Sequence, residues 1–309
     1  MRTDFVNEVG KVLDIKRTDL IEKDFILHQI LTNLSEDKFF AGNFLFKGGT
    51  CLTKSYLGYF RFSEDIDFTW KDQKKFDDKS QKRVRKHLSE LIAETGKIFE
   101  EIAAERGLDF KCVKNNRDYV ELGGSNKTCT YKIWYQSDIL KHRTFLKVQI
   151  NFVERIMFTP KRGKLESLLR GKHEKLEALF TEYKEYVTVI PFETYDIREI
   201  FCEKVRALLT REGSKARDFL DVYFISKKFG IRPENMTRYV VDKLNFALKL
   251  YGKYRTNMKE KIPLLNSGKL FAWGTEKDLL LIDIDEKDFY SFLTKFDVFL
   301  KSIVSNLSY

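Results

Sequence analysis

The chain has 309 residues, 43% of them hydrophobic and 14% aromatic, which is enough for two ordinary cores and excludes long disordered stretches. Its net charge of +10, from 56 basic and 46 acidic residues, favours polyanionic partners such as RNA or nucleotides, although lysines on solvated helix faces explain the excess equally well. No membrane-spanning apolar run occurs and the four cysteines form no CxxC pair, so we expect a cytoplasmic protein without a zinc site.

The first 70 residues predict helices followed by a strand–turn–helix–strand unit. Apolar residues recur at helical spacing over residues 1–36. Asn43–Lys47 predicts a short strand, Gly48-Gly49 a tight turn and Thr50–Leu57 a helix. Phe62–Trp70 alternates polar and apolar residues and predicts a second strand.

The middle of the chain predicts a long helix followed by a sheet. Residues 72–107 form a charged amphipathic pattern, typical of one long helix or a pair. Alternating patterns then predict three strands, which are Tyr119–Leu122, Thr128–Tyr135 and Phe145–Val153.

From about residue 165 onward the pattern is helical nearly throughout. We therefore expect an α+β half followed by an all-helical half. The predicted domains are residues 1–190 and 191–309, with a boundary between 155 and 195.

Asp65 and Asp67 are the main candidates for catalysis. They alternate with Ile66 and Phe68, so in a strand both carboxylates project from one side, roughly 7 Å apart. Two carboxylates at that spacing can hold Mg²⁺ or Mn²⁺, and metal ions there can bridge a triphosphate. The alternative is a pair of solvated acids, with Arg61 neutralising one of them.

The Gly48-Gly49 pair suits a phosphate-binding turn. Without Cβ atoms the backbone can approach phosphate oxygens, and the following helix offers free N–H groups. Thr50 would add a hydroxyl and Lys47 a charge. Either motif alone is common in proteins, but a GG turn followed after one helix by D-x-D is far more specific.

The stretch KGGTCLTKSYLGYFRFSEDIDF resembles the signature of the AbiEii/AbiGii-type nucleotidyltransferases, toxins of bacterial abortive-infection and type IV toxin–antitoxin systems. The resemblance implies a DNA polymerase β-like fold, with an N-terminal mixed sheet, flanking helices and a C-terminal helical bundle. It also implies metal binding and catalysis by Asp65 and Asp67. The nucleotide-binding residues that it implies are Lys47, Gly48, Gly49, Thr50, Arg61, Ser63 and Lys204.

Other segments extend the resemblance from about residue 20 to 300. Glu22–Phe25 is similar to the family's EKDF segment, and Glu203–Leu208 and Ala216–Asp221 resemble its K-x-x-A-L and R-D-x-x-D motifs. Trp273 with Leu279–Ile282 resembles its closing helices.

The later motifs imply further catalytic residues. Lys204 would meet the β- and γ-phosphates, and Asp218 or Asp221 would orient Lys204, accept a proton or pair with Arg217. The alternative is a salt bridge network between two helices, for which R-D-x-x-D is equally suitable.

The strand around Gln149 departs from the superfamily pattern. Many polymerase β-like enzymes carry a third carboxylate there, whereas this chain shows the amides Gln149 and Asn151, and Glu154 has the wrong parity. An amide cannot act as a base. Either Asp218 or Asp221 supplies the base, or the metal activates the attacking group, or activity is reduced or lost.

The sequence thus predicts a metal-dependent transferase that moves NMP from an NTP to an RNA or tRNA end, a protein hydroxyl or a small molecule. An antitoxin protein is the expected partner. Basic clusters at 71–87 and 160–175 are either solvated helix faces or contacts for an RNA acceptor. The alternatives are an aminoglycoside-type nucleotidyltransferase and a catalytically silent protein of the same fold that binds nucleic acid or an antitoxin.

Overall fold

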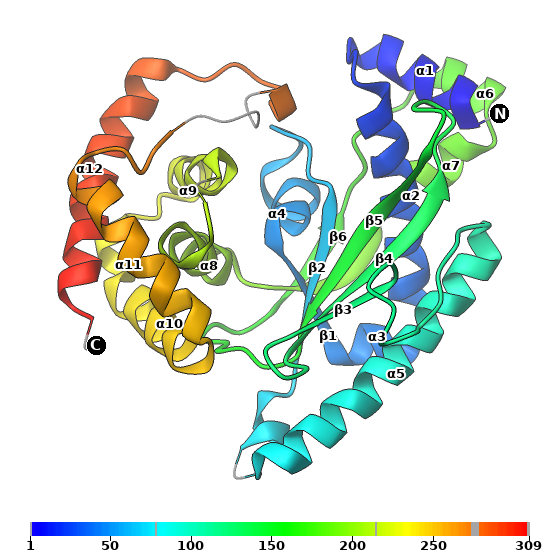
Figure 1. Ribbon diagram of the computed structural model, residues 1–309. Helices are drawn as coiled ribbons and strands as arrows, with labels where there is room; N and C mark the ends of the chain where they lie inside the picture. Colours follow the sequence, from blue (N-terminus) through cyan, green and yellow to red (C-terminus); the bar gives the residue numbers. More distant parts are fainter. Residues whose placement is uncertain (1, 78, 214, 273–277, 308–309) are drawn as a thin grey trace. The chain divides into compact units, whose positions relative to one another are not determined.

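The computed structural model describes residues 2–77, 79–213, 215–272 and 278–307 (Figure 1). The chain divides into two compact units, which we describe separately. The first unit comprises residues 1–154 and 160–194, and the second comprises residues 155–159 and 195–309. Within the described ranges, no helix has the length and apolar character needed to cross a membrane.

The first unit is built on a seven-stranded mixed sheet with the order β3-β4-β5-β2-β1-β7-β6. The pairs β2–β5 and β1–β7 are parallel, and the other neighbours are antiparallel. The strands are β1 (Phe44–Lys47), β2 (Asp65–Trp70), β3 (Val120–Gly123), β4 (Thr128–Gln136), β5 (Arg143–Asn151), β6 (Lys161–Leu165) and β7 (Ile190–Thr194).

The helices of this unit come mainly from before β1 and between β2 and β3. They are α1 (Arg2–Leu13), α2 (Thr18–Glu36), α3 (Lys38–Asn43), α4 (Gly48–Cys51), a π-helix (Leu52–Leu57), a 3₁₀ turn (Gln73–Phe76), α5 (Gln81–Arg106), α6 (Glu174–Leu179) and α7 (Glu182–Tyr186).

An aromatic core joins α3 and α5 to one face of the sheet. Phe40 of α3 lies 4.8 Å from the Phe68 ring of β2, and Phe99 of α5 lies 4.8 Å from Tyr131 of β4. Each such ring buries a large apolar area and anchors its helix to the sheet. Because side chains alternate along a strand, the polar residues of β2 and β5 are left on the opposite face.

The second unit is a bundle of helices. It contains α8 (Ile197–Thr210), α9 (Ala216–Phe229), a 3₁₀ turn (Pro233–Met236), α10 (Thr237–Leu250), α11 (Gly252–Asn266) and α12 (Glu286–Ser305).

A buried ion pair ties residues 155–159 into this bundle. The Glu199 carboxylate accepts hydrogen bonds from the backbone N–H groups of Met157 and Phe158, at 2.8 and 3.0 Å. Lys243 pairs with Glu199 at 2.5 Å and donates to the Arg155 carbonyl at 2.9 Å. Both charged side chains are fully buried, which is tolerable only because each is paired and hydrogen-bonded.

The predicted α+β class, a mixed sheet with flanking helices followed by a helical bundle, is confirmed. The expectation of helix nearly throughout after residue 165 is wrong at β7, which pairs in parallel with β1. A sequence pattern for β7 is weak because Pro191 interrupts its five residues, and β6, also missed, is mostly charged.

Two smaller expectations also need correction. Gly48-Gly49 is not a separate turn, because α4 begins at Gly48. The run Leu279–Ile282 belongs to no α-helix and precedes α12, whereas Trp273 lies outside the described residues.

Candidate active site

The glycine pair lies directly against the second aspartate of D-x-D. Gly48 has a φ of +77°, which L side chains rarely adopt, and a Cβ built on it would lie 2.9 Å from both Cβ and Cγ of Asp67. A Cβ on Gly49 would lie 2.8 Å from Nη2 of Arg61 and 2.9 Å from the Ser63 hydroxyl. Both glycines therefore permit a close approach between the start of α4 and the residues around β2.

Asp65 and Asp67 point to the same side of β2, as the alternation predicts. Both are half-buried, whereas Ile66 and Phe68 between and beside them are fully buried. Across the sheet, Asp67 is in register with Lys47 of β1.

The neighbouring strand β5 places a cation and an amide beside the two carboxylates. Asp65 is in register with Lys147, and Asp67 is in register with Gln149. Both β5 residues are exposed. The amide of Gln149 thus lies beside Asp67, at the position where the superfamily resemblance leads us to expect a third carboxylate.

Thr50 ties the start of the helix to the start of β2. Its buried hydroxyl donates to the Asp65 carbonyl and lies 2.9 Å from the Ser63 hydroxyl. Arg61 is also buried, donates to the Phe62 carbonyl at 2.8 Å and lies over the Phe60 ring. These residues hold the backbone of the glycine segment and of D-x-D together.

Asp65 and Asp67 fit a magnesium ion by the chemistry of their donors. Mg²⁺ prefers oxygen ligands, keeps several waters and is commonly held by one or two carboxylates together with substrate phosphates. Over the described residues, no cluster of three or more His, Cys, Asp or Glu side chains is placed to hold a metal ion. The described side chains that could hold such an ion here are the two carboxylates and the neighbouring Gln149 amide.

A buried polar network joins α2 to the π-helix that follows the glycine segment, and it includes Asp24 of the EKDF segment. The Asp24 carboxylate of α2 accepts hydrogen bonds from Tyr59 at 2.9 Å and from Tyr186 at 2.7 Å, and pairs with Lys54 of the π-helix at 3.1 Å. Burial raises the pKa of Tyr59 and of Tyr186 well above the usual value. The network fixes the π-helix that continues from α4.

His28 closes this network as a neutral ring. Burial, reinforced by the charge of Lys54, lowers the pKa of His28 to about 3. Burial also lowers the pKa of Lys54, although the charge of Asp24 acts in the opposite direction. Nε2 of His28 lies 2.9 Å from the Thr188 carbonyl.

Two further residues of the EKDF segment brace the same region. Glu22 accepts hydrogen bonds from the Ser137 hydroxyl at 2.5 Å and from the Asp138 N–H at 2.9 Å. Lys23 pairs at 2.7 Å with Glu64, the residue before Asp65. This segment therefore contacts the residue that precedes the carboxylate strand and the loop that follows β4.

The second unit brings Lys204, Asp218 and Asp221 together. Lys204 pairs with Asp221 at 2.7 Å and with Asp218 at 3.3 Å, and Arg211 pairs with Asp218 at 2.5 Å. Lys204, Asp218 and Asp221 are all buried. Arg211, which the sequence did not single out, thus joins a network of two cations and two carboxylates.

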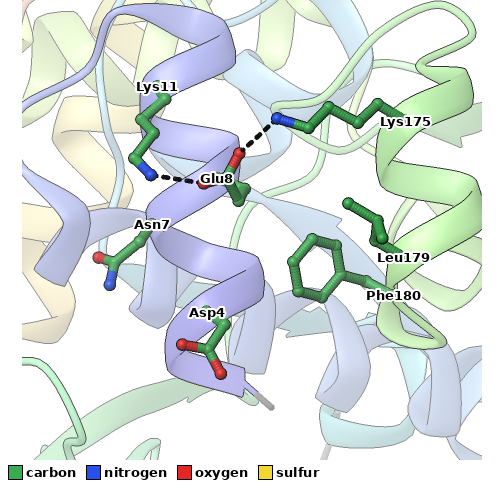
Figure 2. Close-up of a pocket in the computed structure, with 7 residues that line it drawn as sticks. All are labelled: Asp4, Asn7, Glu8, Lys11, Lys175, Leu179 and Phe180. Carbon is green, nitrogen blue, oxygen red and sulfur yellow. Dashed lines mark hydrogen bonds and ion pairs between the residues drawn. The ribbon is translucent and has the colours of Figure 1, made fainter.

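A separate cavity of about 320 Å³ lies between α1 and the end of α6 (Figure 2). Glu8, on its wall, pairs with Lys11 at 2.5 Å and with Lys175 at 3.2 Å. Hydrogen bonds from these lysines hold the pKa of Glu8 below its usual value. The cavity shares no residue with the predicted nucleotide site, and its lysines are already matched by an acid of the same wall.

Comparisons with known proteins bear on the whole chain. Among solved structures, the chain is similar in fold to MenT4, a nucleotidyltransferase toxin from Mycobacterium tuberculosis (15% identity, TM-score 0.51, 98% of this chain and 99% of that one). It also matches JHP933 from Helicobacter pylori, with 17% identity and a TM-score of 0.44 over 94% of this chain and 93% of that one. No curated protein matches the sequence significantly.

The model of the family described as "Nucleotidyl transferase AbiEii toxin, Type IV TA system" matches residues 29–302. This match spans the glycine pair, D-x-D and the network around Lys204. The chain therefore belongs to the AbiEii toxin family of type IV toxin–antitoxin systems and is a nucleotidyltransferase.

Proposed function

We propose that the protein transfers a nucleoside monophosphate from an NTP to an acceptor hydroxyl, with Asp65 and Asp67 holding Mg²⁺ or Mn²⁺. The observation that carries the proposal is the position of Asp67, which lies against Gly48 while its neighbour Asp65 shares the same open face of β2. The reaction forms a bond between the acceptor oxygen and the α-phosphorus, and pyrophosphate leaves.

Each residue of the glycine segment has a part in this proposal. The backbone N–H groups at the start of α4 have no partner within their own helix and would donate to phosphate oxygens. Lys47 and Arg61 would offset phosphate charge, and Ser63 and Thr50 would hold the segment in shape through the contact between their hydroxyls. Bound metal ions would supply neutralisation of charge on the phosphates.

In this proposal the base that accepts the proton of the acceptor hydroxyl is not residue 149. Gln149 occupies the third position, and an amide cannot remove a proton from the acceptor. Asp218 and Asp221 are candidates for the base, and Lys204 for binding the triphosphate. Within their own unit all three are buried and paired with one another, so a structural role is the competing explanation.

The acceptor and the partner follow from charge and family. A net charge of +10 favours an RNA end over an aminoglycoside, which is itself cationic, and a protein hydroxyl is the other acceptor considered. The family implies an antitoxin partner. A cytoplasmic location is part of the proposal, supported by four free cysteines, three of them buried.

Incubation with each α-labelled NTP, total RNA and Mg²⁺ tests the proposal. We expect label in RNA for the wild type, and none for Asp65→Asn or Asp67→Asn. Asp242→Asn, which alters an exposed acid of α10, is the matched control and should transfer normally. Equal transfer by wild type and both site variants would refute the proposed site.

A catalytically silent protein is the second candidate, and Gln149 is the observation in its favour. It requires that the wild type labels no acceptor of any class, including protein and small molecules, while still binding RNA or an antitoxin.

A further inference from the structure

The face of β4 and β5 opposite α5 carries a cluster that we call the aromatic–basic surface, which comprises Lys132, Trp134, Arg143, Phe145 and Lys147. Alternation explains its position, since Ile133 and Tyr135 are buried on the α5 side while Trp134 between them is only half-buried. The cluster is on the same face of the sheet as Asp65, because Lys147 is in register with Asp65.

The residues of this surface lie in two rows that run across the strands, and the first row includes Asp65. The first row is Asp65, Lys147 and Lys132 on β2, β5 and β4. The second row, two residues further, pairs Phe145 with Trp134. Successive rows on one face of a sheet are about 6.6 Å apart. The row that contains the two rings is therefore about 6.6 Å from the row that contains Asp65, measured along the strands.

The two rings form a small platform with cations around it. Their centroids are 4.7 Å apart at an angle of 58°. The Arg143 guanidinium lies 4.3 Å from the Trp134 ring, and the ammonium groups of Lys132 and Lys147 lie 5.6 and 5.7 Å from the Phe145 ring. Aromatic side chains beside cations on an open sheet are the usual means of binding unpaired nucleotides, because every base can stack on a ring.

The charge of Lys147 is the part of this surface that is not matched by an acid. Lys132 pairs with Glu121 at 2.5 Å, and Arg143 pairs with Asp109. Over the described residues, Lys147 makes no ion pair, and its ammonium contacts the Phe145 ring alone. An exposed, unmatched cation between the ring platform and Asp65 is complementary to a phosphate at that point.

We propose that the aromatic–basic surface binds unpaired nucleotides of a polynucleotide acceptor, with bases stacking on Trp134 and Phe145 and a phosphate meeting Lys147. The inference rests on the proposed function, because it names the acceptor class for that same site. Stacking does not distinguish RNA from DNA, so the experiment includes both.

Binding is measured by fluorescence anisotropy with labelled single strands of about 12 nucleotides, as RNA and as DNA, and the full chain. EDTA is present and NTP is absent, so the proposed metal site does not contribute. We expect Trp134→Ala/Phe145→Ala to weaken binding at least about 10-fold and Trp134→Phe to keep most of the affinity. Lys147→Gln should lower the slope of log K against log salt by about 0.7.

Two control variants match these changes elsewhere in the chain. Tyr290→Ala removes an aromatic ring that is 51% exposed, and Lys97→Gln removes an exposed cation of α5. Both should bind as the wild type does. If the double variant has a lowered thermal midpoint, Trp134→Ala alone and the salt slope of Lys147→Gln decide.

Three outcomes would overturn the inference: a double variant of normal stability that binds as the wild type, an unchanged salt slope in Lys147→Gln, or tighter binding of a duplex than of either single strand. Transfer of label to RNA that is unaffected by Trp134→Ala/Phe145→Ala would refute the inference alone. Ring-dependent binding without any transfer would count against the proposed function alone.

Discussion

Replacing Gly48 by Ala tests whether Asp67 must lie where the structure places it. At a φ of +77° an L side chain costs about 1–2 kcal/mol, which lowers the melting temperature of a chain of this size by roughly 2–8 °C. The new Cβ would also overlap Oδ2 of Asp67 and lie 2.9 Å from its Cβ and Cγ, so the aspartate must retreat by more than 0.5 Å before every contact reaches the 3.4 Å of ordinary packing. Because a misplacement of about 1 Å can cost roughly 100-fold in rate, we expect transfer to fall about 10- to 100-fold.

Gly107→Ala is the matched control for this change. Gly107 has a φ of +64°, and no atom lies within 4 Å of the position of its Cβ. It should show a similar loss of melting temperature with unchanged transfer of labelled NMP. Gly42 lies in α3 with open space around its Cβ and no positive φ, so Gly42→Ala should leave transfer unchanged and should not lower the melting temperature. Normal transfer by Gly48→Ala, or an equal loss in Gly107→Ala, would refute the reasoning.

Three other predictions concern Gln149 and the buried network. Gln149→Asp places a third carboxylate beside Asp67, so the protein should bind Mn²⁺ more tightly than the wild type does. Isothermal titration calorimetry measures this affinity, and an unchanged or weaker affinity would contradict the arrangement. Asp24→Asn leaves the Lys54 charge buried without its partner, so it should lower the free energy of unfolding, measured in urea, by about 3–5 kcal/mol. Asp24→Asn/Lys54→Met should recover part of that loss, because it also removes the charge. If the double variant recovers nothing, the ion pair is not the cause of the loss. His28 has a folded-state pKa of about 3 against 6.5 when unfolded, so the unfolded state binds the extra proton, and stability present above pH 6.5 is lost as the pH falls towards 3. Between pH 6.5 and 4.5 the wild type should therefore lose up to about 1.4 kcal/mol per pH unit more than His28→Gln, and parallel curves would contradict the assignment.

The strand that carries the carboxylates could be predicted from the sequence because its information is local. Alternation of Asp65, Ile66, Asp67 and Phe68 determines which side chains share a face, and the structure confirms it. The same argument placed Gln149 on the polar face of its strand, and the register beside Asp67 bears this out.

The missed features depend on residues far apart in the chain. Strand β7 is stabilised by its pairing with β1, about 150 residues earlier, and nothing in its five residues predicts that partner. The Asp24 network joins α2, the π-helix and Tyr186, which is 162 positions away from Asp24. Such a network becomes visible only when the fold brings its members together.

Around Lys204, the sequence predicted which residues come together but not that they are buried and paired. The motifs place Lys204, Asp218 and Asp221 one helical turn or one helix apart, and the structure brings all three into contact. Their burial and the additional pairing of Asp218 with Arg211 depend on how the helices pack, which spacing alone does not determine.

The interrupted path of the chain through its two units limits how the protein can be divided. Residues 155–159 belong to the second unit, although residues 160–194, which complete the first unit, follow them in the chain. Their hydrogen-bonding partners Glu199 and Lys243 come only after that stretch. A fragment that stops at residue 194 would expose this segment, and one that starts at residue 195 would leave the Glu199 carboxylate and Lys243 without the backbone groups that bind them. A fragment that starts at residue 195 is therefore expected to be less stable than the same bundle in the whole chain, because a buried ion pair loses the backbone groups that satisfy it.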